Sequence, residues 1–426
     1  MISSFSSSIF MVLVFGISYL FLKRKLITSK FYFVLLFLMG AAGIVLPLDK
    51  YVHYYSLNYN AAYILLFSIL VIMTLIPWLK FDKAFSNWGM ICIKEKYIGL
   101  LKIVFFINIV LGLYAIIYSF PYALMALSMG ADDVRQFIAD ESFYPKSILT
   151  TVCVGIGYLT PIQILLFYIS LLHYDLRKYS ILLFITSLSY LITMLPYAAR
   201  DGFIFLPLTY FFMYKVFSPS LPDTLKLRIR KYALVLGGII SFGVLFISYQ
   251  RFYLNAKSGL SSFDSMIYGT WGYFFQQPFV FEQTISYDVS YFGFDRRFEL
   301  LNNIFSIPKH IYILDSITTS FGTMYSEFYN CYGWSSLIGF SLFYYISFSV
   351  LLGYHIGRKH YLSILLVFII YLYYTISGLF YYKMYLISVT ELYLVILFFS
   401  LFIRNVLTVS KINPNDKKHY PNINSN

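Results

Sequence analysis

The chain has 426 residues, of which 59% are hydrophobic and only 12% are Asp, Glu, Lys or Arg, and its mean hydropathy is +0.72. Soluble domains carry about 25% charged residues, so this composition excludes a soluble globular protein and indicates an integral membrane protein. The formal net charge is +13. In a soluble chain this charge would suggest a nucleic-acid partner, but here it is distributed as membrane topology requires, and we expect no nucleic acid.

Apolar segments follow one another along most of the chain. Eleven are long enough to cross about 30 Å of hydrocarbon, which takes roughly 20 helical residues. They cover residues 5–22, 31–48, 59–79, 98–119, 148–172, 179–197, 202–217, 232–249, 335–356, 361–382 and 385–403. The first lacks a preceding basic region and a small-residue cleavage site, which favours a spanning helix over a removable signal peptide. The pattern predicts an all-α, polytopic transmembrane bundle over residues 1–410.

The distribution of Lys and Arg predicts the orientation of this bundle. If the N-terminus lies outside, most Lys and Arg residues fall in the inner loops, and the alternation holds at nearly every connection. The sequence therefore predicts an N-out, C-in protein with two long outer connections, 120–147 and 250–334, and a polar cytoplasmic tail, 411–426. The support for this topology is weakest at the short gap between the last two segments, where a re-entrant pair of helices is the alternative. No pair of Gly- or Pro-interrupted segments, as in inverted-repeat transporters, stands out.

The stretch PYAARDGFIFLPL puts Arg200 and Asp201 between two apolar segments, at the predicted outer face. Charges at such a place are costly unless they lie at a water interface or in a polar cavity. Arg251 emerges at the same face after the eighth segment. Because a guanidinium binds phosphate through two parallel hydrogen bonds, two such groups could hold a lipid-linked diphosphate. The alternatives are snorkelling for the arginines and a favourable helix start for Asp201.

The 250–334 connection is rich in Tyr, Phe, Gly and Gln. Aromatic faces and amide groups suit sugar rings, so Tyr253, Trp271 and Tyr325 are candidate substrate-binding residues. Arg296 and Arg297 join them as a charge cluster. The competing interpretations are an aromatic belt at the membrane interface and a solvated turn.

Acidic residues supply candidates for acid–base or metal chemistry. Glu327 approaches the ninth segment, where a carboxylate in a membrane-level cavity could act as a general base; the alternative is a surface charge. His310 is interpreted as a surface residue. Asp132 and Asp133 could hold a divalent ion, but a solvated helix end is the favoured interpretation. The three cysteines form no C-x-x-C pair, so neither a metal site nor a disulfide framework is expected.

Three features occur together in this sequence: an arginine at the outer end of a mid-chain hairpin, another arginine after the following helix pair, and a large outer loop that ends in FGTMYSEFYNCYGWSSLIG. In this combination the chain resembles the Wzy-type oligosaccharide repeat-unit (O-antigen) polymerases. Many members begin the following helix with an Asp-Phe-Gly step and a second glycine. Here the corresponding stretch is Asn330-Cys331-Tyr332-Gly333. The acidic residue is missing, and Glu327 is only a nearby substitute.

The resemblance implies a glycosyltransferase in the bacterial cytoplasmic membrane, with its active site on the extracytoplasmic side. It would join a glycan on undecaprenyl diphosphate to the next lipid-linked repeat unit, for O-antigen of lipopolysaccharide or for capsule. Arg200 and Arg251 would stabilise the departing diphosphate, Glu327 or Asp201 would activate the acceptor hydroxyl, and no metal or cofactor is expected. Its partners would be the lipid-linked donor and acceptor, membrane lipid, a chain-length regulator and a flippase.

Two other functions remain open from the sequence. An O-antigen ligase shares the helix number and the large outer loop. A transporter or flippase of lipid-linked oligosaccharide is the alternative from a different class. It is disfavoured because transporters place charges at mid-membrane and keep their loops short, whereas most charges here lie outside the predicted spans.

Overall fold

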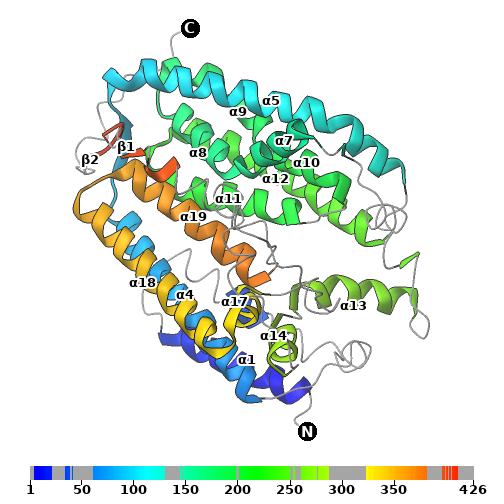
Figure 1. The fold of residues 1–426 in the computed structure, drawn as a ribbon. Coiled ribbons are helices and arrows are strands. Elements are labelled where there is room, and N and C mark those ends of the chain that lie inside the picture. Colours follow the sequence, from blue (N-terminus) through cyan, green and yellow to red (C-terminus); the bar gives the residue numbers. More distant parts are fainter. Residues whose placement is uncertain are drawn as a thin grey trace.

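The computed structural model describes residues 4–21, 34–38, 41, 61–129, 144–145, 147–197, 201–249, 253–254, 261–275, 277–286, 323–380, 396–398, 400–401, 403 and 405–410. The described chain is predominantly helical (Figure 1), which confirms the all-α prediction for this part. The α-helices are α1 (Ser4–Phe21), α4 (Ala61–Ser86), α5 (Ile98–Ser128), α7 (Ile148–Tyr158), α8 (Thr160–Leu171), α9 (Ser180–Thr186), α10 (Ser189–Met194), α11 (Asp201–Phe217), α12 (Asp223–Ser248), α13 (Ser262–Phe275), α14 (Gln277–Ser286), α17 (Met324–Tyr332), α18 (Trp334–Gly357) and α19 (Tyr361–Phe380). Short 3₁₀ turns are η1 (Glu95–Tyr97), η2 (Tyr174–Tyr179), η3 (Leu195–Tyr197) and η4 (Ser218–Ser220).

Helices cover nine of the eleven predicted segments, and the other two, 31–48 and 385–403, lie largely outside the described residues. Four described helices are long and apolar enough to cross a membrane: Ala62–Ser86, Glu95–Ser128, Tyr174–Tyr197 and Trp334–Gly357. A fifth span is formed if α7 and α8, which meet at an angle of 51°, are counted as one. The protein is therefore a helical membrane protein, while the number of eleven spans stays a prediction.

The long connection 250–334 is not simply a loop, as the sequence suggested. Within its described part it contains three helices, α13, α14 and α17. Cys331, expected in a long polar loop, is completely buried. The reason is that aromatic residues on α17 pack against the neighbouring helices, as described below, and composition alone cannot separate such a short buried helix from an aromatic loop.

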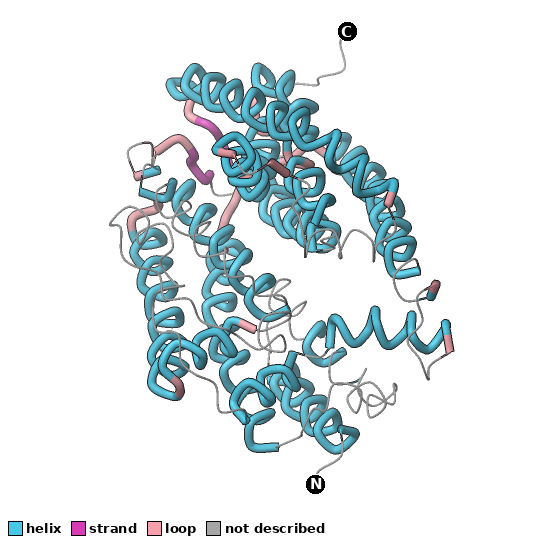
Figure 2. Tube along the Cα trace, turned by 45° about the vertical axis from the view of Figure 1, so that its right-hand side comes forward, coloured by secondary structure: helices cyan, strands magenta, loops and turns pink. Residues whose placement is uncertain are grey.

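The helices form two groups that meet at α19 (Figure 1). Helices α1, α4, α14, α17 and α18 contact one another in the first group, and α5 with α7 to α11 in the second. Figure 2 shows the same two groups after a 45° rotation. Trp78 of α4 is fully buried where they meet, with Phe212 of α11 at 5.9 Å and Phe368 of α19 at 5.3 Å between ring centroids. The core is therefore continuous across both groups.

Two neighbouring helices of the second group are interrupted at the same level. The break between α7 and α8 falls at Leu159, just before Pro161, and the break between α9 and α10 falls at Ser187 and Leu188. Thr160 Oγ1 donates to the Ser187 carbonyl oxygen at 3.2 Å, so the two breaks satisfy each other's polar groups. The sequence showed no such pair because the second break contains neither Gly nor Pro.

A small antiparallel sheet closes one end of the bundle. Strand β1 (Met90–Ile93) pairs with β2 (Leu407–Ser410), and the Ile91 N–H donates to Ser220 Oγ of η4 at 2.7 Å. The sheet therefore ties the α4–α5, α11–α12 and C-terminal segments together. We use the name basic end for the described cations that the Lys and Arg pattern assigns to one side of the membrane: Lys80, Lys83, Lys94, Lys96, Arg177, Lys178, Lys215, Lys226, Arg228, Arg230, Lys231, Arg358 and Lys359.

Candidate functional site

Helix α17 is a short buried helix that folds back into the bundle. Its eight residues from Met324 to Cys331 are buried, and Gly333, with φ of 68°, reverses the chain directly into α18. Only glycine adopts this left-handed conformation without strain. The Phe328 ring packs on Phe340 and Tyr344 of α18, at centroid distances of 5.3 and 5.4 Å. Helix α17 therefore runs back along α18.

The first turn of α17 lies far from either end of the bundle. Tyr325 is fully buried; its hydroxyl donates to the Leu70 carbonyl oxygen at 2.9 Å and also bonds the Thr74 hydroxyl, near the middle of α4. Tyr344, the partner of Phe328, lies ten residues into α18, or about 15 Å along its axis. The start of α17 is therefore about halfway along two candidate membrane spans. The other ends of these spans, at Lys83 and Arg358, form part of the basic end.

One face of α17 carries polar side chains. At 100° per residue, Ser326, Asn330 and Glu327 fall within an arc of about 100°. Their exposed fractions are 1%, 1% and 8%. Asn330 Oδ1 is buried and has no hydrogen-bond partner in the described part of the chain. A buried amide oxygen without a partner is costly, so Asn330 is a candidate for contact with a ligand.

A second buried carboxylate lies on the neighbouring helix α14. Glu282 is 1% exposed. Its neighbour Phe281 packs on Phe67 of α4 and on Tyr325, at centroid distances of 5.5 and 6.3 Å, which fixes α14 against α17. Carboxylates inside a membrane bundle are rare, so Glu282 and Glu327 are candidate functional residues. Among the described residues, no group of three or more His, Cys, Asp or Glu side chains could hold a metal ion.

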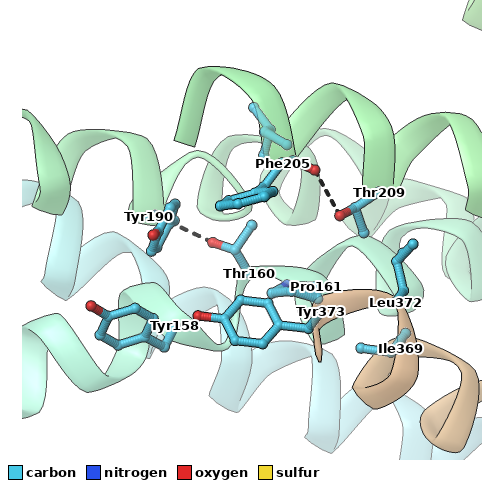
Figure 3. Close-up of a pocket in the computed structure, with 10 residues that line it drawn as sticks. Tyr158, Thr160, Pro161, Tyr190, Phe205, Thr209, Ile369, Leu372 and Tyr373 are labelled. Atoms are coloured by element: carbon cyan, nitrogen blue, oxygen red, sulfur yellow. Dashed lines mark hydrogen bonds between the residues drawn. The ribbon is translucent and has the colours of Figure 1, made fainter. Parts of the chain in front are cut away.

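A cavity lies beside the α7–α8 break (Figure 3). It is narrow: its free volume is about 20 Å³, room for about one water molecule, and its mouth is open. Its lining residues are Tyr158, Thr160, Pro161, Tyr190, Phe205, Leu206, Thr209, Ile369, Leu372 and Tyr373. Thr160 Oγ1 accepts the Tyr190 N–H at 3.2 Å, and Thr209 Oγ1 donates to the Phe205 carbonyl oxygen at 2.7 Å. Because both threonine hydroxyls bond the backbone, the cavity presents mainly rings and methyl groups.

The cavity and α17 lie along the same helix, α19. Gly378 packs so closely on α17 that a Cβ there would lie 2.8 Å from Met324 Sδ. Tyr373 lines the cavity five residues earlier, about 7.5 Å along the α19 axis. On its other side the cavity is bounded by α11. Phe205 and Thr209 lie about 6 and 12 Å along the α11 axis from Asp201, the first residue of that helix.

The structure describes only some of the predicted site residues. Arg200, Arg251, Arg296 and Arg297 lie outside the described residues, as do His310, Asp132 and Asp133. Asp201 begins α11 and Trp271 belongs to α13, but their side chains are not among those described.

The remaining candidates differ in their surroundings. Tyr253 is 37% exposed and stacks on Tyr249 at a centroid distance of 4.8 Å. Tyr325 is buried against α4 and holds α17 in place. Glu327 lies inside the bundle, so the interpretation as a surface charge was wrong. Sequence reasoning missed Glu282 and Asn330; the only signal for Glu282 was a single carboxylate within the apolar stretch PFVFEQTI.

Together these features define a helical membrane protein with a polar, carboxylate-bearing helix buried inside its bundle. The chain matches no protein-family model, no curated protein and no solved structure.

Proposed function

We propose that the protein is an extracytoplasmic glycosyltransferase that polymerises undecaprenyl-diphosphate-linked oligosaccharide repeat units into a surface polysaccharide. One observation carries the proposal: Glu327 is buried at mid-depth, on the polar face of a helix that folds back into the bundle from the end away from the basic loops. With the basic end in the cytoplasm, this site opens to the extracytoplasmic side of the bacterial inner membrane. The proposal includes the eleven-span, N-out topology.

The proposed reaction uses Glu327 as the general base. Its carboxylate accepts the proton of the acceptor sugar hydroxyl as that oxygen bonds to the anomeric carbon of the donor. The bond from this carbon to the diphosphate breaks through an oxocarbenium-like state, and the lipid diphosphate leaves with the electron pair. Arg200 and Arg251 neutralise the charge that develops on it. Asn330 accepts a hydrogen bond from a sugar hydroxyl, which would satisfy its buried amide oxygen.

The cavity beside α11 has room for about one water molecule, so in this scheme the carrier chain lies in the surrounding lipid while its diphosphate binds at the start of α11. Tyr253, Trp271, Arg296 and Arg297 are proposed to contact the sugars from the 250–334 connection. Asp201 is the alternative base, and the residues of the site require no metal or cofactor in this scheme.

The test is chain growth by the purified full-length protein supplied with lipid-linked repeat units. Glu327→Gln keeps the shape of the side chain and removes the base, so we expect a loss of about 10²–10⁴-fold in elongation rate. Arg200→Ala and Arg251→Ala are expected to lose elongation as well. Glu95→Gln, which changes an exposed carboxylate near the basic end, is the control and is expected to elongate normally.

The outcomes separate the competing functions. Normal elongation by folded Glu327→Gln would reject Glu327 as the base and move attention to Asp201. Transfer of the glycan to a different lipid acceptor without chain growth would indicate a ligase. Movement of lipid-linked sugars across vesicles without any new glycosidic bond would indicate a flippase.

A further inference from the structure

Helix α12 changes character at one point along its length. Its cations, Lys226, Arg228, Arg230 and Lys231, all precede Tyr232. Beyond that point, large apolar side chains are exposed, with Tyr232 at 67%, Leu234 at 78% and Phe242 at 70%. Exposed apolar side chains of this kind suit contact with hydrocarbon, which would place the charged turn at the level of lipid headgroups.

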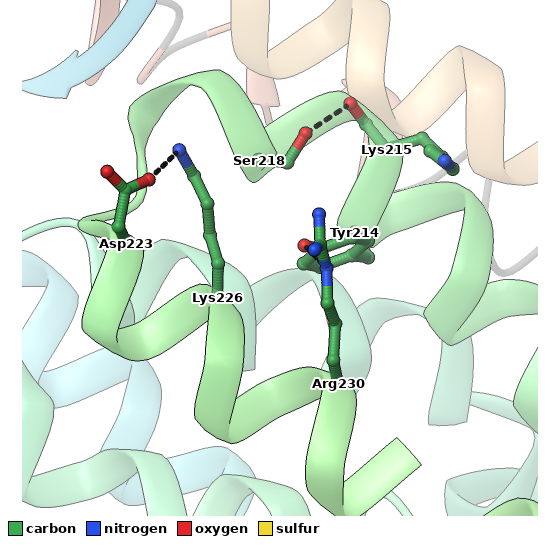
Figure 4. Close-up of polar contacts among 6 residues, drawn as sticks. All are labelled: Tyr214, Lys215, Ser218, Asp223, Lys226 and Arg230. Atoms are coloured by element: carbon green, nitrogen blue, oxygen red, sulfur yellow. Dashed lines mark hydrogen bonds and ion pairs between the residues drawn. The ribbon is translucent and has the colours of Figure 1, made fainter. Parts of the chain in front are cut away.

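Arg230 is held in a fixed orientation at this level (Figure 4). Its Nε donates to the Tyr214 hydroxyl of α11 at 3.0 Å, and its guanidinium carbon lies 6.0 Å from the centre of the Tyr214 ring. The two terminal amino groups have no bonded partner among the described residues. A guanidinium fixed through Nε in this way presents its two terminal groups as a fork, the geometry that binds phosphate oxygens in pairs.

The turn between α11 and α12 has little negative charge of its own. In the described chain its one acidic residue is Asp223, which pairs with Lys226 at 2.9 Å (Figure 4). Lys215, Arg228, Arg230 and Lys231 make no ion pair within the described residues. Lys215 rests over the Phe211 ring at 5.3 Å, so it too combines an apolar stem with an outward charge. The turn therefore offers uncompensated cations beside a hydrocarbon-facing surface.

We propose that the α11–α12 turn binds the phosphodiester headgroup of anionic phospholipids, with Arg230, oriented by Tyr214, as the principal ligand. A freely diffusing anion would need only the cations, whereas a phospholipid also covers the apolar residues of α12 that follow them. The inference uses no residue of the proposed glycosyl-transfer site. It stands or falls independently of that function.

The test compares the binding of fluorescent phosphatidylglycerol and phosphatidylcholine by the full-length protein in mixed micelles. Arg230→Gln is expected to weaken phosphatidylglycerol binding about fivefold, the factor expected for one cation near an anionic surface. Tyr214→Phe keeps the ring but removes the acceptor of Nε–H, and we expect a smaller loss. Arg228→Gln removes an equal charge from the opposite face of the same helix and is expected to bind normally.

Three results would overturn the inference. Equal binding of both lipids would exclude recognition of the negative headgroup, and equal losses for Arg228→Gln and Arg230→Gln would indicate diffuse attraction without a site. Displacement of phosphatidylglycerol by millimolar inorganic phosphate would indicate a free-phosphate site. Thermal unfolding of each variant in micelles with phosphatidylcholine checks that it is folded. If Arg230→Gln does not fold, a loss of phosphatidylglycerol binding by Tyr214→Phe but not by Arg228→Gln still supports the site, and equal binding by these two variants rejects it.

Discussion

The contact between α5 and α9 yields the sharpest test of the second helix group. Gly112 of α5 faces Thr186 of α9, and a Cβ at Gly112 would lie 2.5 Å from Thr186 Cβ and 2.8 Å from its Cγ2. Ordinary contact between such atoms begins near 3.4 Å. Thr186 Cβ is fixed to the backbone, so no rotamer change relieves the clash. Gly112→Ala must therefore move the two helices apart by about 1 Å.

The expected cost follows from two opposing terms. Overpacking of this kind costs about 1–3 kcal/mol. Replacing a helical glycine by alanine returns about 1 kcal/mol. We therefore expect Gly112→Ala to lower the free energy of unfolding by up to about 2 kcal/mol, and to be about 1–3 kcal/mol less stable than a helical glycine-to-alanine change that meets no neighbour. A Cβ added at Gly99, on the same helix, would have no atom within 4 Å, so Gly99→Ala is expected to be neutral or stabilising.

The assay is thermal unfolding of purified protein in one detergent, with both single variants measured side by side. Thr186→Gly removes the opposing Cβ. The double variant Gly112→Ala/Thr186→Gly should therefore be more stable than the sum of the two single losses predicts. If Gly112→Ala and Gly99→Ala have the same unfolding midpoint, α5 and α9 do not pack as described, and the reasoning fails.

Three further predictions address other parts of the molecule. Truncation after Asn405 removes β2 with the buried Leu407 and should lower the unfolding midpoint, whereas truncation after Ser410 should leave it unchanged. Ile369→Phe places a larger side chain beside this narrow cavity and should lower the free energy of unfolding by about 1–3 kcal/mol through overpacking; an unchanged unfolding midpoint would contradict the described packing of α19. Burial raises the pKa of Tyr144, so its stabilising effect is present below the usual value near 10 and is lost as pH rises through the folded value. Wild type should then lose more stability than Tyr144→Phe above about pH 10, measured by unfolding midpoints across that range.

Most of the helices could be predicted because each depends on a local property, a run of apolar residues of sufficient length. Trp78 shows the limit of this approach. Its sequence context predicts a membrane helix, but its packing against Phe212 and Phe368 joins residues far apart in the chain. The strand pair escaped prediction for the same reason: β1 and β2 are four residues each and lie more than three hundred residues apart.

The candidate site was predicted only in part. Glu327 was identified from its approach to an apolar segment, but its burial depends on the reversal at Gly333 and on Tyr325 reaching α4. Neither contact is visible in the local sequence. Asn330 was noted only as a departure from an acidic motif, and its importance follows from the three-dimensional fact that its amide oxygen is buried without a partner in the described chain.

The arrangement along α19 explains how a polar helix is tolerated inside this bundle. Helix α17 brings Ser326, Glu327 and Asn330 to mid-depth, where the burial of polar groups is costly. The cost is tolerable because Tyr325 anchors the opposite face of the helix to α4 and because Gly378 lets Met324 approach α19 closely. A bound sugar would satisfy the amide oxygen of Asn330. Under the proposed function, such a ligand would offset the cost of this one unpaired oxygen, whereas the contacts of Tyr325 and Met324 hold α17 in place without it.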